Sequence, residues 1–358
     1  MRAVGYQTAG AINAHNAHNA HNAHNAHNAH NAHNALENIT LAEPTPTGFD
    51  LLVEVKAISV NPVDTKIRAS SSAPAGEYKI LGWDAVGVVK AIGDKVSLFK
   101  VGDEVWYAGD ISRSGSYAEY QLVDERIVGH KPNSLSNAQA AALPLTSITA
   151  WELLFDRLGL PQDGSATDAR ILIIGAAGGV GSIITQLAVK LTGAEVIGTA
   201  SRPESATWVQ TLGADAVINH NQPLSQELAK LDIADVTHVI SLTQTDKHFD
   251  EIVKVLRPQG KLALIDDPVG PLDVMKLKRK SLSLHWELMF TRSLYQTEDM
   301  IAQHHLLNRI AELIDTGTVK STFGEHYGTI NAQNLLKAHA QIESGKAIGK
   351  IVLEGFSQ

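Results

Sequence analysis

The chain contains no cysteine among its 358 residues. This absence excludes disulfide bonds, catalytic thiols and every metal site that is built from thiolate ligands. An excess of basic residues is also missing, because the formal net charge is −8 and the isoelectric point is about 6.0. An acidic chain is a poor partner for nucleic acids and for anionic membranes, so we expect neither.

Long apolar runs are equally absent. The first ten residues, MRAVGYQTAG, hold no apolar segment of the kind that a signal peptide needs, and no run approaches the roughly 20 residues of a membrane span. We therefore expect a cytoplasmic protein. The length and the hydrophobic content of 44% are typical of a globular protein with two domains, each with its own core.

Apolar residues larger than alanine are missing from residues 14–34, where the tripeptide Ala-His-Asn is repeated seven times. Asparagine and histidine are weak helix formers, and a repeat of three residues matches neither the helix period nor the strand period. We expect a flexible surface loop. Its seven histidines would also allow adventitious binding of Zn²⁺, Ni²⁺ or Cu²⁺, as in a purification tag, and a specific metal role is the less favoured alternative.

The clearest positive signal is a glycine-rich turn that follows a buried strand. Residues 171–174, Ile-Leu-Ile-Ile, form a short apolar run typical of a central parallel strand. In the segment that follows, Ala176, Gly178 and Gly181 occupy the three glycine positions of the G-x-G-x-x-G pattern. A helix with apolar residues at helical spacing starts near Val180 and directs its free N–H groups toward phosphates. This strand–turn–helix unit predicts dinucleotide binding.

The next strand of this unit ends in Gly-Thr-Ala-Ser-Arg at residues 198–202, without an acidic residue. Sites for NAD usually place Asp or Glu at this point to bind the ribose 2′-hydroxyl. Ser201 and Arg202 suit a 2′-phosphate instead, because arginine presents a planar fork of donors. The sequence therefore favours NADPH over NADH.

The first third of the chain and the part after residue 170 differ in pattern. The first third has strands punctuated by glycine, without strand–helix alternation, and this predicts a separate β-rich domain. After residue 170, strands and helices alternate, which predicts an α/β fold with a doubly wound, six-stranded parallel Rossmann sheet. We expect a Rossmann domain of residues 146–290 and a β-rich domain of residues 1–145 with 291–358. The expected Rossmann strands are residues 171–174, 195–199, 216–218, 237–241, 261–265 and 282–286.

Other elements complete this outline. Residues 138–143 and 150–158 are expected to be helical, with Pro144 between them. Two more helical segments are expected at residues 297–315 and 331–343. The final expected strand, residues 349–353, is predicted to return to the β-rich domain.

Several motifs are specific to one family when they occur together. They are Asn-Pro-Val-Asp-Thr at residues 61–65, Gly-Trp-Asp-Ala-Val-Gly-Val-Val at 82–89, Gly-Asp-Glu-Val at 102–105, Ala-Leu-Pro-Leu-Thr-Ser-Ile-Thr-Ala at 142–150, and the glycine-rich turn. With them the chain resembles the medium-chain dehydrogenase/reductase superfamily, and within it the zinc-independent quinone oxidoreductase (zeta-crystallin-like) branch. Proteins of this kind are often labelled zinc-type alcohol dehydrogenase-like. The resemblance covers all of the chain except the histidine repeat, and it implies that the β-rich domain is GroES-like and catalytic.

The resemblance also raises the question of zinc. Zinc-dependent members hold the metal with a Cys in the segment that matches residues 61–65, a His-Glu pair where this chain has Trp83-Asp84, and a later Cys. Here no cysteine exists and Trp83 replaces the histidine. Asp64 and Asp84 alone make no tetrahedral zinc site, so we expect no metal. Without a Lewis acid to draw a proton from an alcohol, reduction of an acceptor that is already electrophilic is easier.

The function that the resemblance implies is an NADPH-dependent, zinc-independent transfer of hydride to a quinone or an α,β-unsaturated carbonyl. Two alternatives remain open. One is an alcohol dehydrogenase or ketone reductase of the same superfamily, and the other is an NADPH-binding protein with little turnover. The expected partners are a small-molecule substrate and a second copy of the chain, because the family commonly forms homodimers.

By resemblance, Asn61 and Asp64 line the catalytic site near the nicotinamide and the substrate. Asn61 also has a simpler interpretation, as a turn residue before Pro62. Many quinone oxidoreductases carry a tyrosine where this chain has Lys66, which leaves the proton donor open. Lys66 and Tyr107 are the two candidates for it.

A larger set of residues is expected to bind the cofactor. They lie in the glycine-rich turn, at the carboxyl ends of strands, or at positions that match contacts in the family. They are Thr146, Thr149, Ala176, Gly178, Gly179, Val180, Gly181, Ser201, Arg202, Asn219, Ser241, Leu242, Thr243, Ile265, Asp266, Met289, Phe290, Gly349 and Lys350.

Overall fold

The computed structural model describes residues 1–12 and 36–356, so the Ala-His-Asn repeat and the loop expected there lie outside the described residues. The chain divides into two compact units. We call Met1–Leu145 together with Phe290–Gln358 the β-rich unit, and Thr146–Met289 the Rossmann unit.

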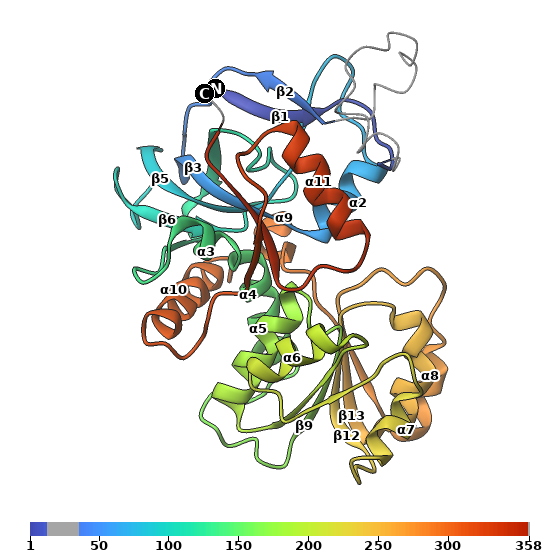
Figure 1. The fold of residues 1–358 in the computed structure, drawn as a ribbon. Helices are drawn as coiled ribbons and strands as arrows, with labels where there is room; N and C mark the ends of the chain where they lie inside the picture. The colour runs from blue at the N-terminus through green and yellow to red at the C-terminus, as the bar shows by residue number, and fades with distance from the viewer. Residues whose placement is uncertain (13–35, 357–358) are drawn as a thin grey trace, which may run out of the picture. The chain divides into compact units, whose positions relative to one another are not determined.

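The Rossmann unit is built on a six-stranded parallel sheet, part of which is labelled in Figure 1. The order of the strands is β11-β10-β9-β12-β13-β14, and each neighbouring pair runs parallel. This arrangement confirms the predicted doubly wound sheet. The strands are β9 (Arg170–Ile174), β10 (Glu195–Thr199), β11 (Ala216–Ile218), β12 (Val236–Ser241), β13 (Leu256–Leu264) and β14 (Ser283–Trp286).

One strand begins earlier than expected. The strand expected from residue 261 starts at Leu256, because Leu256 already pairs with Val236 ahead of a shift in register. The core of this unit includes Leu172, Val239 and Leu262, one from each of three neighbouring strands. The helices and helical turns are α5 (Gly179–Leu187), a π-helical turn (Ala188–Thr192), α6 (Pro203–Thr211), α7 (Leu224–Ala229), α8 (Thr245–Val255) and a 3₁₀ helix (Val274–Lys280).

The β-rich unit contains a seven-stranded sheet whose order is β15-β16-β3-β5-β6-β8, with β7 also paired to β3. All its pairs are antiparallel except β15 with β16. The strands are β3 (Asp50–Val60), β5 (Asp84–Ile92), β6 (Glu104–Tyr107), β7 (Tyr120–Asp124), β8 (Val128–His130), β15 (Phe323–His326) and β16 (Lys350–Glu354). Because β16 pairs with β3, the prediction that the last strand returns to this unit is confirmed.

A second, three-stranded sheet and several helices complete the β-rich unit. The sheet has the order β2-β1-β4, and helices α2 and α11 lie side by side (Figure 1). Its strands are β1 (Arg2–Tyr6), β2 (Glu37–Thr40) and β4 (Lys79–Ile80). The helices are α2 (Pro62–Ser70), α3 (Asn137–Ala141), α9 (Thr291–Tyr295), α10 (Ala302–Asp315) and α11 (Ala332–Glu343), with a short 3₁₀ turn at Glu125–Ile127.

The prediction around Pro144 was wrong in one respect. Pro144 does not separate two helices but begins α4 (Pro144–Trp151), which continues as a π-helical turn over Glu152–Arg157. The reason is that proline fits the first position of a helix, where its missing N–H costs no hydrogen bond.

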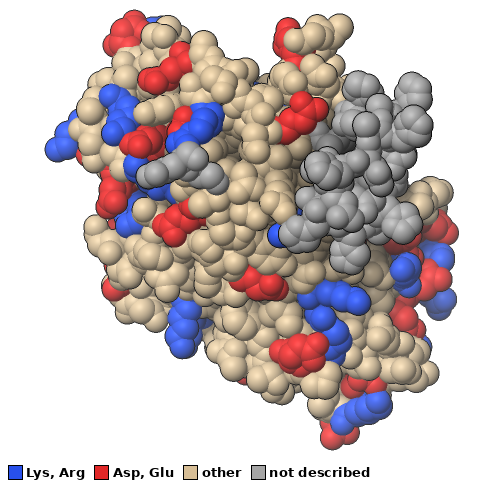
Figure 2. Space-filling view, turned by 45° about the horizontal axis from the view of Figure 1, so that its top comes forward, with Lys and Arg blue, Asp and Glu red and all other residues tan. Residues whose placement is uncertain are grey.

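Within residues 1–12 and 36–356, no helix combines the length and the apolarity that crossing a bilayer requires. On the face shown in Figure 2, acidic and basic side chains are interspersed over the described surface. Neither sign of charge gathers there into the extended patch that nucleic-acid binding favours.

Candidate functional site

The glycine-rich turn connects β9 to α5 at the carboxyl edge of the Rossmann sheet. Gly175 has a φ of +85°, in the left-handed region that glycine adopts without strain. At Gly181, an added Cβ would lie 2.5 Å from the carbonyl oxygen of Gly175 and 2.6 Å from Cα of Ala176. At Gly178, the nearest atom to an added Cβ is 3.5 Å away. Gly181 is therefore needed for helix packing, whereas the space beside Gly178 is open.

Helix α5 begins with backbone N–H groups that no side chain caps. Its N-cap residue is Gly178, which has extended backbone and no side chain to accept a bond. The first turn, which contains Gly179 and Val180, thus presents free N–H groups and the positive end of the helix dipole. These groups and the open space fit the pyrophosphate of a dinucleotide.

The carboxyl ends of parallel strands meet at one edge of a sheet, so several predicted residues lie near the glycine-rich turn. The structure brings them to this shared edge. They are Ser201 and Arg202 after β10, Asn219 after β11, Ser241, Leu242 and Thr243 at the end of β12, and Ile265 and Asp266 after β13.

Arg202 is the N-cap residue of α6 and is half-buried, and Ser201 beside it is exposed. The Nε atom of Arg202 lies 3.6 Å from Oε1 of Glu204. An ion pair at this separation near the surface is weak. Because the Arg202 side chain is 37% exposed, an added anion can reach its guanidinium group.

Ser241 and Asp266 have protein partners at this edge. Asp266 Oδ2 accepts the backbone N–H of Thr245 at 2.9 Å, and Oδ1 accepts the hydroxyl of the same residue. Ser241 Oγ lies 2.7 Å from that hydroxyl. These bonds hold the first turn of α8 on the sheet. Asn219 Oδ1 accepts the N–H of Asn221 at 2.9 Å and so closes a turn.

Thr199 and His220 contribute to the same edge but were not predicted. Thr199 Oγ1 accepts the N–H of Gly175 at 3.2 Å and lies 3.1 Å from Nδ1 of His220. Their signal in the sequence is positional, because Thr199 ends β10 and His220 follows β11 by two residues. Of the remaining predicted residues in this unit, Thr146, Thr149 and Met289 are buried.

In the β-rich unit, buried polar side chains gather around Asp84. Asp84 Oδ2 accepts bonds from Ser59 Oγ at 2.6 Å, Asn61 Nδ2 at 2.8 Å and Lys350 Nζ at 3.1 Å. Asp84 Oδ1 accepts the backbone N–H of Leu145 at 2.7 Å. The carboxylate is thus fully bonded, and the Lys350 ammonium compensates its charge.

Lys350 is buried as well and reaches three acceptors. Besides Asp84, its ammonium donates to Asn61 Oδ1 and, at 3.2 Å, to the carbonyl oxygen of Val60. Gly349 before it has a φ of +65°. A buried ion pair is favourable only when further hydrogen bonds satisfy both ions, as they do here. The side-chain amide of Asn61 is held from both sides, by Asp84 and by Lys350.

Asn61 also begins α2. It has extended backbone, Pro62 occupies the first helical position, and Asp64 Oδ2 accepts the backbone N–H of Asn61 at 2.9 Å. This is the acidic half of a capping box. The sequence Asn-Pro-x-Asp carries the signal for this helix, which was not predicted. Full burial raises the pKa of the Asp64 carboxyl to about 7.

The two candidate proton donors lie in different surroundings. Lys66 is on the exposed side of α2, one turn along from Asn61. Tyr107 is fully buried in β6, its hydroxyl has no hydrogen-bond partner in the described structure, and burial raises its pKa well above the usual range. Neither makes a hydrogen bond to Asp84 or Lys350 among the bonds found there.

The position that holds zinc in related enzymes has a different chemistry here. Trp83 directs its indole N–H to the carbonyl oxygen of Asp110 at 3.1 Å and packs edge-on against Phe290, with ring centroids 6.0 Å apart. Asp84 is already bonded to an ammonium group. Across the described ranges, no three His, Asp or Glu side chains gather as metal ligands. These residues do not fit a zinc ion.

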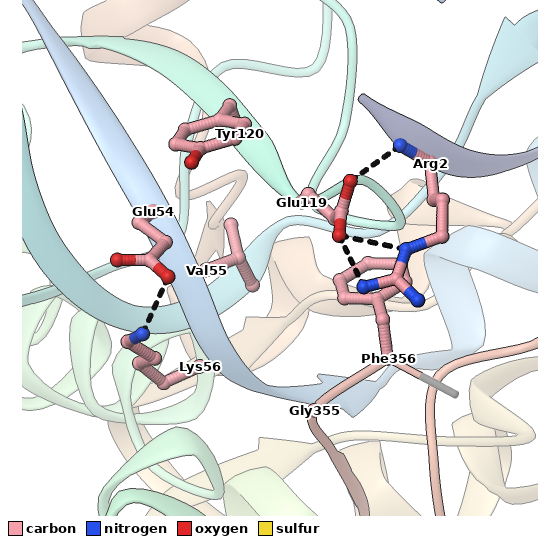
Figure 3. Close-up of a pocket in the computed structure, with 8 residues that line it drawn as sticks. All are labelled: Arg2, Glu54, Val55, Lys56, Glu119, Tyr120, Gly355 and Phe356. Carbon is pink, nitrogen blue, oxygen red and sulfur yellow. Dashed lines mark hydrogen bonds and ion pairs between the residues drawn. The ribbon is translucent and has the colours of Figure 1, made fainter. Parts of the chain in front are cut away.

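A small surface pocket of about 140 Å³ lies beside β3 and the residues that follow β16 (Figure 3). Its charged side chains pair with each other, Arg2 with Glu119 and Lys56 with Glu54. The ring of Phe356 lies under the Arg2 guanidinium, 5.8 Å from ring centroid to Cζ. Because these charges are already compensated, we do not assign this pocket a catalytic role.

Two family models match the chain. A model of the alcohol dehydrogenase GroES-like domain matches residues 47–133, and a model of zinc-binding dehydrogenases matches residues 212–353. Among curated proteins, a zinc-type alcohol dehydrogenase-like protein of Staphylococcus epidermidis is 41% identical over 312 residues. That match covers 87% of this chain and 92% of the relative.

Solved structures give the same picture. A protein from Rhizobium etli whose crystal structure is described as that of a putative zinc-dependent alcohol dehydrogenase is 49% identical, with a TM-score of 0.90. The match covers 100% of this chain and 99% of the Rhizobium etli chain. A quinone oxidoreductase from Pseudomonas syringae is 25% identical with a TM-score of 0.78, and 99% of each chain is covered.

Proposed function

The chain belongs to the medium-chain dehydrogenase/reductase superfamily, and from this premise we propose that it is an NADPH-dependent, zinc-independent reductase of quinones or α,β-unsaturated carbonyls. Its fold is that of a dinucleotide-binding oxidoreductase. The acceptor, the choice of NADPH and the absence of a zinc step are the parts that we infer.

The observation that carries the proposal is the cluster of Asp84, Asn61 and Lys350. The Lys350 ammonium group and the Asn61 amide both donate hydrogen bonds to the Asp84 carboxylate, which would otherwise be available to a metal. Without a Lewis acid, a simple alcohol is a poor hydride donor, because its proton must leave first. A quinone or an enone accepts hydride more readily, since the product anion is delocalised. A quinone oxidoreductase is also among the similar structures.

NADPH supplies the hydride when it is bound. We assign its pyrophosphate to the first turn of α5 and its 2′-phosphate to Ser201 and Arg202. The exposed hydroxyl and the accessible guanidinium support this assignment, and so does the absence of an acid at the end of β10. In the β-rich unit, we assign Asn61 to the acceptor, and we assign Lys350 the role of holding Asn61 and Asp84 in place. Of the two proton-donor candidates, we favour Lys66, which is exposed, over Tyr107, which is fully buried.

The test is an acceptor panel. NADPH oxidation is followed at 340 nm with small quinones, enals, simple ketones and, in reverse, alcohols with NADP⁺, before and after treatment with EDTA. We expect turnover with quinones or enals that EDTA leaves unchanged. Turnover only with ketones and alcohols would favour the alcohol dehydrogenase alternative, which the names of the relatives support. Tight NADPH binding without turnover would favour the binding-protein alternative.

We also propose a homodimer formed through the Rossmann unit. Strand β14 is the last strand of its sheet, so one of its edges has no neighbour within the described chain. Trp286 and Leu288 beside this edge are 54% and 51% exposed. An open strand edge next to exposed apolar side chains favours pairing with a second copy. Light scattering coupled to gel filtration would measure the mass, and Trp286→Lys should shift it toward the monomer.

A further inference from the structure

Three fully buried polar side chains in the β-rich unit form a continuous hydrogen-bonded chain. The Tyr117 hydroxyl lies 2.9 Å from Asp64 Oδ2 and 3.0 Å from Nε2 of His339. Asp64 Oδ2 in turn accepts the backbone N–H of Asn61. This series of hydrogen bonds therefore connects His339 on α11, through Tyr117 in the loop before β7, to Asn61 at the start of α2.

The residues around Asp64, Tyr117 and His339 leave space for these side chains and fix the two helices that carry Asp64 and His339. At Gly82, whose φ is +87°, an added Cβ would lie 2.3 Å from the Tyr117 ring, so glycine provides the space for that ring. Buried Arg68 on α2 pairs with Glu343 at the end of α11. A buried polar network is costly unless its bonds are made, and an apolar core would serve packing alone equally well. Asp64 Oδ1 and His339 Nδ1 nevertheless remain unpartnered in the described structure.

The Tyr117 hydroxyl has one proton and two acceptors. In one pattern it donates to the Asp64 carboxylate and accepts from the Nε2–H of His339. In the other, a protonated Asp64 donates to the tyrosine oxygen, and Tyr117 donates to a bare Nε2, so that the histidine carries its proton on Nδ1. The heavy atoms need not move between the two patterns.

We propose that Asp64, Tyr117 and His339 act as a positioning relay for Asn61, which changes between these two bonding patterns when Asp64 takes up a proton. In the ionised pattern, Asn61 N–H donates to a full carboxylate, which is the stronger kind of bond. In the protonated pattern, the Oδ2–H group of Asp64 donates a hydrogen bond to the Tyr117 oxygen, and Oδ2 becomes a poorer acceptor for the Asn61 backbone N–H. The hydrogen bond from the Asn61 backbone to Asp64, which holds the first turn of α2, is then weaker.

The electrostatics allow only one of the three groups to change charge near neutral pH. Burial is the main cause that raises the pKa of Asp64, and the charge of Asp84 adds to it. The bonds from the Asn61 backbone and from Tyr117 and the charge of Lys350 lower it, and together these causes bring the pKa to about 7. Burial and the nearby Asp64 hold the pKa of Tyr117 well above its usual value. Burial, with the charge of Arg68, lowers the pKa of His339 to about 3. His339 therefore stays neutral and changes tautomer only.

The first experiment needs no turnover. Full-length protein labelled with ¹⁵N-histidine is titrated by NMR, and the His339 signals are identified by their loss in His339→Gln. We expect His339 to change from the Nε2–H to the Nδ1–H tautomer as the pH falls through about 7, and to stay in one tautomer in Asp64→Asn. A single tautomer in the unmodified protein from pH 5 to pH 9 would overturn the relay.

The second experiment rests on the proposed function, in which Asn61 lines the catalytic site. The pH profile of kcat with a quinone is measured for Tyr117→Phe, for His339→Gln and for Tyr6→Phe. Tyr6 is a matched control, because its hydroxyl is also buried against α2 but bonds the carbonyl oxygens of Ile67 and Ser71 at the far end of the helix. Loss of the Tyr117 bond should move the inflection upward by about one pH unit. His339→Gln should move it less, in the same direction, and Tyr6→Phe should leave it in place.

The two experiments separate two kinds of failure. If no acceptor is turned over, the proposed function fails, and the tautomer titration still decides the relay. If turnover is present but Tyr117→Phe and His339→Gln both keep the profile of Tyr6→Phe, the relay is wrong and the proposed function stands. If Tyr117→Phe does not fold, His339→Gln and the titration of the unmodified protein give the answer.

Discussion

The carboxyl edge of the Rossmann sheet and the buried cluster of Asp84, Asn61 and Lys350 differ in how their polar groups are satisfied. At the carboxyl edge of the Rossmann sheet, the candidate binding groups are backbone N–H groups beside glycines that have no side chain, together with Arg202. In the β-rich unit, the candidate groups are the charged side chains of Asp84 and Lys350 and the amide of Asn61, which bond one another and are almost fully buried. An open edge tolerates the loss of one contact, whereas a closed network does not, because each partner removed leaves another buried and uncompensated.

The largest effect is expected from breaking the closed network at Lys350. Lys350→Met leaves the Asp84 carboxylate buried without its counter-ion, and we expect a loss of about 3–5 kcal/mol in the free energy of unfolding. Denaturant unfolding measures it. Lys337→Met, at an exposed position of α11, is the control and should change stability by less than about 0.5 kcal/mol. The double variant Lys350→Met with Asp84→Asn should recover part of the loss, and strict additivity of the two changes would contradict the coupling.

The pH dependence of stability is expected to be the next largest effect. The folded pKa of Asp64, about 7, lies above its unfolded value, so its contribution is fully present at low pH and is lost as the pH rises through about 7. His339, whose pKa is lowered to about 3, acts in the opposite direction and loses stability as the pH falls below its unfolded value. The difference in unfolding free energy between the unmodified protein and Asp64→Asn isolates the first term. It should fall by roughly 3 kcal/mol between pH 5 and pH 8, and a flat difference would refute the assignment.

Substitutions at Gly181 and Gly178 should distinguish an effect on helix packing from an effect on NADPH binding. In Gly181→Ala, the new Cβ meets backbone atoms at 2.5 and 2.6 Å, and we expect a loss of about 1–3 kcal/mol in stability. In Gly178→Ala, the nearest atom is 3.5 Å away, so the fold should persist while NADPH affinity, measured by fluorescence titration, falls about tenfold or more. An unchanged NADPH affinity in Gly178→Ala would show that the open space beside Gly178 is not a ligand site.

The smallest effect is expected at the open edge itself. Arg202→Glu should raise the KM for NADPH about tenfold, or about 1.4 kcal/mol, and leave the KM for NADH nearly unchanged, because only NADPH carries the 2′-phosphate. Arg257→Glu, at an exposed position elsewhere in the same unit, is the matched control. A similar change in both KM values for Arg202→Glu would remove the 2′-phosphate role.

The sequence predicted the Rossmann sheet because its signals are local. The run of residues 171–174 and the glycines that follow are neighbours in the sequence, each later strand or helix is marked by its own short segment, and the predicted strands are present. Helix α2 is not among the predicted elements, although Asn61, Pro62 and Asp64 mark its beginning, because Asn-Pro is also typical of a turn. Helix α4 begins earlier than predicted, because Pro144 starts this helix instead of separating two helices.

By itself, the sequence determined that no thiol chemistry is present, that a dinucleotide fold exists and that its second strand ends without an acid. Only the tertiary structure decided the environment of the buried charges. Asp84 meets Lys350 across 266 residues, and Tyr117 meets His339 across 222. No local pattern encodes such contacts, since they depend on which faces of β3, β5, β16 and α11 the fold brings together. The sequence gives only the identity of an aspartate. Whether water, an ammonium group or a tyrosine contacts its carboxyl group depends on the fold, and those contacts determine its charge and its chemistry.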